Sequence, residues 1–157
     1  MSTHFDRMVQ LADEFFSTKN DPDQLDVTPE VMEQLEKIHP ATLSEEVEGD
    51  GPVVWILLIP TVNHLMQEFL EGRIGERELL LRTPLDAKYD TVYLCSALVL
   101  PEYRNQGRAE RVTLQALRSI QRDHPIQQLF TWPFSQEGER LSQRISDQLI
   151  LPLLRRK

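Results

Sequence analysis

The segment Val99–Ala109, VLPEYRNQGRA, constrains the fold of this chain more than any other part of the sequence. It follows an apolar run, Thr91–Leu100, that predicts a strand, and it opens an amphipathic pattern, Arg108–Arg122, that predicts a helix. When a strand turns through a glycine into a helix, the first backbone N–H groups of the helix have no intrahelical acceptor, and the helix dipole adds partial positive charge. Such a helix start binds phosphate groups well. The sequence therefore predicts a site for a phosphate-bearing ligand at residues 104–109.

The spacing Arg104-x-x-Gly107-x-Ala109, after the lead-in Val99-Leu-Pro-Glu-Tyr, resembles the acyl-CoA-binding signature of the GNAT acyltransferase superfamily. In that family the signature follows the fourth strand and binds the pyrophosphate of CoA. The resemblance covers about residues 91–149. It implies an α/β (α+β) fold of the GNAT type, with a mixed central sheet flanked by helices. The alternative is an ordinary strand-to-helix turn.

The resemblance also implies a set of ligand contacts. The backbone amides of Asn105 to Ala109 would bind the pyrophosphate, and the strand edge at Leu98 and Val99 would bind the pantetheine arm. The complete set of cofactor-binding residues that the resemblance implies is Leu98, Val99, Arg104, Asn105, Gln106, Gly107, Arg108, Ala109 and Ser135. The implied function is transfer of an acetyl group from acetyl-CoA to a primary amine, on a small molecule or a protein.

Two catalytic positions that the resemblance implies do not hold the usual residues. Family members often carry a carboxylate base on the fourth strand, but the corresponding same-face positions here are Tyr93 and Cys95. Many also carry a tyrosine seven residues into the last helix, and that position is Ser142, counted from Ser135. A serine hydroxyl protonates a leaving thiolate poorly. The catalytic residues are therefore unassigned. The alternative function is that of a catalytically degenerate acyl-CoA-binding or regulatory module, and a third possibility is a partner-binding domain that does not bind CoA.

Other candidate residues have a structural and a functional interpretation each. Cys95 is either an acyl-carrying nucleophile, which requires a nearby base and exposure, or a packing residue of a buried strand. His64 and Glu68 lie one helical turn apart and either face an acceptor or form a solvated face; without a third ligand they predict no metal site. Arg108 and Arg111 either meet the 3′-phosphate of CoA or are plain surface. Trp132 and Phe134 either line the pantetheine channel or belong to the core.

The distribution of charge excludes one class of partner. The net charge of −8 is distributed unevenly. Residues 1–90 contain 19 acidic and 7 basic side chains, whereas residues 91–157 contain 6 acidic and 10 basic side chains. A basic half suits a polyanion such as CoA, and an acidic half suits a cationic acceptor, although acidic surfaces also serve solubility alone. The overall acidity argues against nucleic-acid binding, which requires a clustered basic surface.

Length and composition predict a single GNAT-like domain over residues 1–157. No apolar run is long enough to cross a bilayer, and the N-terminus lacks the pattern of a signal sequence. The only cysteine, Cys95, allows no disulfide framework. These features predict a cytoplasmic protein that does not act at a membrane and contains no metal.

Local patterns predict the remaining elements. The predicted helices are residues 4–18, 29–39 and 136–149, and Thr28 and Ser135 are the predicted N-caps of the last two. The predicted strands are residues 41–48, 52–60 and 128–132, with a hairpin turn at Gly49–Gly51 between the first two. The segment 61–82 departs from the GNAT pattern because it predicts two helices, the first capped by Thr61, where a short turn is usual. We expect this helical insertion, which precedes the fourth strand of the GNAT pattern, to lie on the acceptor side of the sheet. Only eight residues follow Leu149, so the closing strand pair of a full GNAT domain is expected to be truncated or absent.

Overall fold

A computed structural model of the chain describes residues 3–17, 25, 28–133 and 135–157. Its centre is a five-stranded mixed sheet in the order β1-β2-β3-β4-β5. The strands are β1 (Leu43–Glu48), β2 (Gly51–Thr61), β3 (Thr91–Val99), β4 (Gln128–Thr131) and β5 (Leu153–Arg155). Strands β1 to β3 pair antiparallel, whereas β3, β4 and β5 pair parallel.

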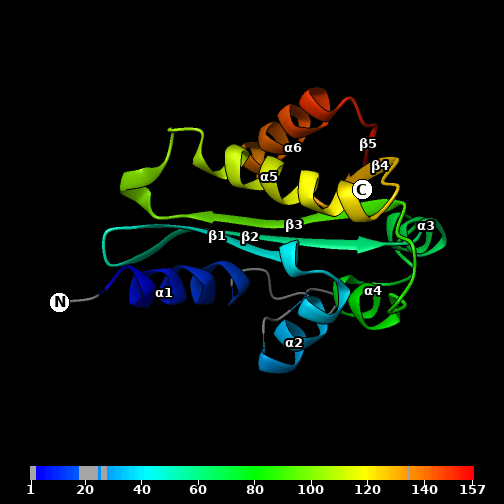
Figure 1. Cartoon of the computed structure of the whole chain (residues 1–157), viewed down its shortest axis with the longest axis horizontal. Helices are drawn as coiled ribbons and strands as arrows, with labels where there is room; N and C mark the ends of the chain where they lie inside the picture. Colours follow the sequence, from blue (N-terminus) through cyan, green and yellow to red (C-terminus); the bar gives the residue numbers. More distant parts are fainter. Residues whose placement is uncertain (1–2, 18–24, 26–27, 134) are drawn as a thin grey trace.

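Helices lie on both faces of this sheet (Figure 1). Helices α5 (Arg108–Asp123) and α6 (Gln136–Leu149) lie on one face, and α1 (His4–Ser17) and α2 (Pro29–Ile38) lie on the other. The insertion forms α3 (Asn63–Leu70) and α4 (Glu76–Arg82) at the end of the sheet where β2 stops and β3 begins. Two short 3₁₀ turns, Pro40–Thr42 and Pro101–Tyr103, precede β1 and follow β3. The architecture is therefore the mixed central sheet flanked by helices that the sequence predicts.

Local capping signals act as expected at two helix starts. Thr28 accepts a hydrogen bond from the Val31 N–H, with Pro29 at the first helical position. Ser135 accepts from the Gly138 N–H at 3.0 Å and so caps α6. Gly49, at φ +65°, forms the hairpin between β1 and β2. Residue 18, the last of the first predicted helix, and Phe134 lie outside the described residues.

One expectation about the chain is wrong. Thr61 does not cap α3, because it is the last residue of β2 and its hydroxyl pairs with that of Thr83 at 2.7 Å. Val62 precedes the helix without a side-chain cap. After Leu149 the chain forms one short strand: β5 pairs with β4 through Leu129↔Leu153, Phe130↔Leu154 and Thr131↔Arg155. Of the two expected outcomes for this segment, truncated or absent strands, the structure agrees with the first.

The sheet is irregular where β3 leaves β4. The register between β2 and β3 passes from Leu57↔Ser96 to Leu58↔Leu94, so Cys95 is the extra residue of a β-bulge. The parallel pairing of β3 with β4 ends just before it, at Tyr93↔Phe130. Bulges bend a strand and re-aim its side chains. This bulge therefore marks the point at which the two parallel strands separate.

Two histidines accept backbone hydrogen bonds where α2, β3 and α5 meet. His39, which is buried, accepts from the Ala41 N–H through Nδ1 at 3.0 Å and lies 2.7 Å from Asp123 through Nε2. The Tyr89 N–H donates to His124 Nδ1 at 3.3 Å. Burial, together with the neighbouring His39 and Lys88, lowers the pKa of His124 below its usual 6.5, despite the opposing charge of Asp123.

This lowered pKa predicts a stability that depends on pH. The unfolded chain binds a proton at His124 more readily than the folded chain does. The contribution of neutral His124 to the free energy of unfolding is therefore complete above about pH 6.5, and it is lost as the pH falls through the lower pKa of His124 in the folded protein. Urea unfolding at pH 7.5 and pH 5.5 should show the wild type losing stability on acidification. His124→Asn, whose amide oxygen can replace Nδ1 as acceptor, should lose less; an equal loss in both proteins would contradict the assignment.

Candidate functional site

One edge of β3 is open beyond the bulge. Leu94 to Val99 pair with β2 on one side, but in the described part of the chain no strand pairs with their other side. Thr131, at the end of β4, donates through its hydroxyl to the Leu94 carbonyl at 3.3 Å, and this contact closes the narrow end of the gap. Leu98 and Val99, the residues expected to bind pantetheine, lie farther along β3, at its carboxyl end. The unpaired strand edge leads toward the start of α5.

The loop at residues 104–109 has the geometry of an anion site. Gly107, at φ +73° and ψ +13°, is the left-handed N-cap of α5, and Asn105 is also left-handed at φ +62°. The first amide with a helical acceptor is that of Arg111, which donates to the Gly107 carbonyl at 3.0 Å. Among the described residues, the N–H groups of 105–110 have no acceptor. A Cβ atom at Gly107 would meet nothing within 4 Å, so the space beside this glycine is open.

Ion pairs hold the ends of this loop. Arg7 of α1 donates to both carboxylate oxygens of Glu102 at 2.6 Å, and this pairing lowers the pKa of Glu102 to about 2. Arg104 donates through Nε to the Val99 carbonyl at 2.9 Å, which fixes the turn that follows β3. The loop is therefore tied to both α1 and β3.

The two arginines considered for the 3′-phosphate are paired with carboxylates of the strand β1. Arg108 contacts Glu46 and Glu48, each at 2.5 Å, and its guanidinium lies over the Tyr103 ring. Arg111 contacts Glu46 at 3.1 Å. Arg108 is thus a tether between α5 and the β1–β2 hairpin rather than plain surface.

A buried carboxylate lies against the strand positions at which the sequence shows no acid. Glu76 begins α4 and is fully buried. Its Oε2 accepts the Tyr93 hydroxyl at 2.5 Å and lies 3.6 Å from Cys95 Sγ, while its Oε1 accepts the Leu25 N–H at 2.8 Å. We call Glu76, Tyr93 and Cys95 the carboxylate cluster. Its formation depends on the insertion, because α4 supplies the acid that β3 lacks.

The environment of the cluster keeps Tyr93 protonated. Burial, followed by the charge of Glu76, raises the pKa of the Tyr93 hydroxyl well above 10, and the Arg156 charge opposes this rise only in part. Tyr93 is fully covered, whereas Cys95 is 8% exposed. Cys95, a buried residue, is therefore the most exposed member of the cluster.

Arg156, just beyond β5, is the cation near this cluster. It is buried, donates to the Ile74 carbonyl at 3.0 Å, and lies 3.9 Å from the Trp132 ring and 4.7 Å from the Phe69 ring. The short strand β5 places it there. Trp132 thus packs against the core and the C-terminal segment.

A shallow depression lies at the start of α6, just after the end of β4. This open depression of about 500 Å³ is lined by Pro133, Ser135, Gln136, Glu139 and Arg140. The Ser135 hydroxyl is engaged in capping the helix, and Ser142 is buried on its inner side. On the insertion, Glu68 pairs with Arg82 at 3.2 Å, so it belongs to a salt bridge of the helix surface.

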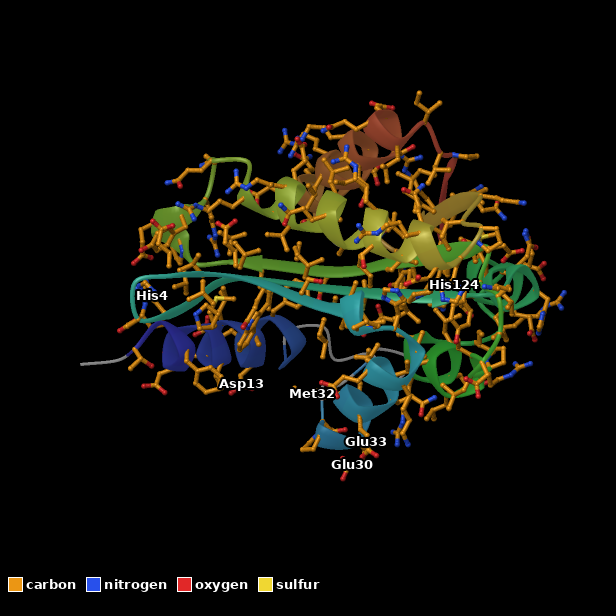
Figure 2. The ribbon with its side chains drawn as sticks, in the orientation of Figure 1. His4, Asp13, Glu30, Met32, Glu33 and His124 are labelled. Atoms are coloured by element: carbon orange, nitrogen blue, oxygen red, sulfur yellow. The ribbon has the colours of Figure 1, made fainter. Side chains whose placement is uncertain are left out.

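The acidic excess of the N-terminal half lies partly on the outside of α1 and α2. Figure 2 shows Asp13, Glu30 and Glu33 pointing away from the sheet. No helix in the described residues is long and apolar enough to span a membrane. Over the same residues, no group of three or more His, Cys, Asp or Glu side chains is arranged to hold a metal ion.

Comparison with known proteins supports the fold. No protein-family model and no curated protein matches the sequence. A solved structure described as the NatB acetyltransferase complex bound to a bisubstrate inhibitor contains a chain with a similar fold. The match has a TM-score of 0.52 and 13% sequence identity, and covers 86% of this chain and 68% of that one. At this identity the likeness concerns the fold alone.

Sequence reasoning found the loop and the strand edge but missed Glu76 and Arg156. An acid in the first turn of a helix is ordinary, because it complements the helix dipole, so Glu76 carries no local sign of burial. Arg156 is one of several arginines near the C-terminus. Only the packing of α4 and β5 against the sheet distinguishes these two residues from surface charges.

Proposed function

We propose that this chain is an N-acyltransferase that moves an acetyl group from acetyl-CoA to a primary amine. The observation that carries the proposal is the set of free amides at 105–110, with open space beside Gly107, together with the unpaired edge of β3. Both features are what a CoA molecule requires: amides for the pyrophosphate and a strand edge for the pantetheine.

In this proposal Asn105, Gln106, Gly107, Arg108 and Ala109 bind the pyrophosphate mainly through their backbone, and Leu98 and Val99 bind the pantetheine. The strand edge directs the thioester toward the bulge at Cys95. Holding the thioester beside an incoming amine lowers the barrier by proximity and orientation. The capped start of α6 at Ser135 forms the opposite wall.

Turnover tests this proposal directly. Purified protein is incubated with acetyl-CoA and a panel of primary amines: spermidine, polylysine and a peptide with a free N-terminus. Release of the CoA thiol that depends on the amine, together with an acetylated product, is the expected result. Binding of acetyl-CoA without thiol release would instead select the degenerate acyl-CoA-binding module, which Ser142 at the tyrosine position favours.

Replacing Ser142 should have a small effect. A hydroxyl with a pKa far above neutrality orients a thiolate but hardly protonates it, so Ser142→Ala should lower the transfer rate by less than about tenfold. General acid catalysis by a well-matched group contributes about 100- to 10,000-fold. A loss of 100-fold or more in kcat, with unchanged affinity for CoA, would show that Ser142 is the proton donor.

A further inference from the structure

We propose that Glu76, acting through the Tyr93 hydroxyl, accepts the proton of the incoming amine, so that the helical insertion completes the active site. This inference rests on the proposed acetyl transfer. An amine that is protonated in solution must lose a proton before its nitrogen can attack a thioester. The cluster lies at the bulge toward which the open edge of β3 leads.

The hydrogen bonds give the direction of proton movement. An ionised carboxylate only accepts hydrogen bonds, and both oxygens of Glu76 face donors: the Leu25 N–H on one, and the Tyr93 O–H with the Cys95 S–H on the other. The 2.5 Å distance between Tyr93 and Glu76 is short enough for direct proton transfer. A carboxylate with a hydroxyl in front of it therefore forms a two-step path for a proton.

Each proton has a defined destination. The ammonium group gives one proton to the Tyr93 oxygen as Tyr93 gives its own to Glu76, which leaves a neutral amine, a neutral tyrosine and a neutral carboxyl. The amine nitrogen attacks the acetyl carbon, the C–S bond breaks, and the CoA thiolate takes the second nitrogen-bound proton. Glu76 then releases its proton to solvent. The products are the acetamide, CoA thiol and one proton.

The surroundings of Glu76 suit this role. The titratable and charged groups near the cluster are Tyr93 and Cys95 on β3 and Arg156 beyond β5. The positive charge of Arg156 lowers the pKa of Tyr93 and so partly offsets the rise that burial and Glu76 cause. Because Tyr93 and Glu76 are covered, the inference requires that the ammonium group enter the cluster beside Cys95, which is 8% exposed.

A purely structural role for Glu76 predicts a different outcome on substitution. Glu76→Gln keeps the shape of the side chain and an oxygen for the Leu25 N–H, but it cannot take up a proton. Glu78→Gln is the matched control, because Glu78 lies on the same helix, is exposed, and pairs only with Arg82 among the described residues. Circular dichroism and melting temperature identify any variant that fails to fold.

The pH dependence of kcat/KM separates the two roles. With an amine from the panel of pKa near 10, the wild type should show a plateau through neutral pH, because the ammonium form is itself the substrate. Glu76→Gln should rise about tenfold per pH unit toward the amine pKa, as only the neutral amine reacts. The loss should be about 1,000-fold at pH 7 and under tenfold at pH 10. A uniform loss, or a plateau that persists in Glu76→Gln, would overturn the inference.

Tyrosine titration gives a readout that requires no acceptor. Three tyrosines absorb near 295 nm when ionised, and Tyr93 should ionise last because its pKa lies well above 10. Glu76→Gln removes the neighbouring negative charge and should shift this last step to lower pH, whereas Glu78→Gln should not. An unchanged titration would show that the hydroxyl and the carboxylate are not in contact in solution.

The tyrosine itself has a matched control. Tyr93→Phe removes the intermediate hydroxyl and should reproduce the pH profile of Glu76→Gln. Tyr89→Phe removes the hydroxyl of another covered tyrosine, which donates to the Pro84 carbonyl, and should leave the profile unchanged. If Tyr93→Phe keeps the wild-type plateau, the path through Tyr93 is wrong. If the wild type acetylates no amine and binds no acetyl-CoA, the proposed function itself is wrong, and this inference with it.

Discussion

Acetyl-CoA at one hundred times its dissociation constant should raise the melting temperature of the wild type by about 5–11 °C, and Gly107→Glu should abolish this rise. A ligand that binds only the folded state adds about 2.7 kcal/mol at that concentration, and each kcal/mol is worth about 2–4 °C for a chain of this size. A glutamate at Gly107 places bulk and negative charge among the free amides of the loop. Differential scanning fluorimetry with and without acetyl-CoA measures both effects.

Gly107→Ala is the control for backbone strain. Any L-residue at φ +73° is strained by about 1–2 kcal/mol, so both variants should melt a few degrees lower than the wild type without ligand. The alanine adds no charge, and its Cβ meets no protein atom within 4 Å, so the ligand-dependent rise should persist. Normal acetyl-CoA binding by Gly107→Glu would place the cofactor elsewhere, and no rise in the wild type at millimolar acetyl-CoA would count against CoA binding altogether.

Phe69→Ala should destabilise the protein more than any other single truncation in the insertion. Phe69 is fully buried on α3 and packs against the rings of Tyr93, Phe130 and Trp132 at centroid distances of 4.8 to 5.9 Å. Removing a buried phenylalanine ring costs about 3–5 kcal/mol, because the remaining cavity collapses only in part. The melting temperature should therefore fall by about 6–20 °C.

Leu81→Ala is the matched control on the neighbouring helix. Leu81 is 61% exposed on α4, and exposed substitutions of this kind change stability by about 0.5 kcal/mol or less. A fall of under 3 °C in Phe69→Ala would show that the insertion packs weakly on the sheet. Because α3 and α4 are joined by only five residues, weak packing of Phe69 would also displace Glu76 from Tyr93.

The sequence by itself determined the elements whose signals are local. Thr28 and Ser135 mark helix starts through their own hydroxyls, and Gly107 marks the turn between β3 and α5. The apolar run within β2 and the periodicity of α5 identify a central strand and a helix that covers it. These signals act within a few residues, so they can be read without the tertiary structure.

The tertiary structure alone decided the composition of the carboxylate cluster and the place of Arg156 beside it. Glu76 is hydrogen-bonded to Tyr93, 17 residues away in the sequence, and to Leu25, 51 residues away. Arg156 is hydrogen-bonded to Ile74, 82 residues away. Charged side chains are almost always exposed, so the burial of these two depends on partners that only long-range packing supplies. The sequence therefore predicted where the cofactor phosphates are expected, at the turn of Gly107, whereas only the fold placed the carboxylate of Glu76 beside Tyr93 and Cys95.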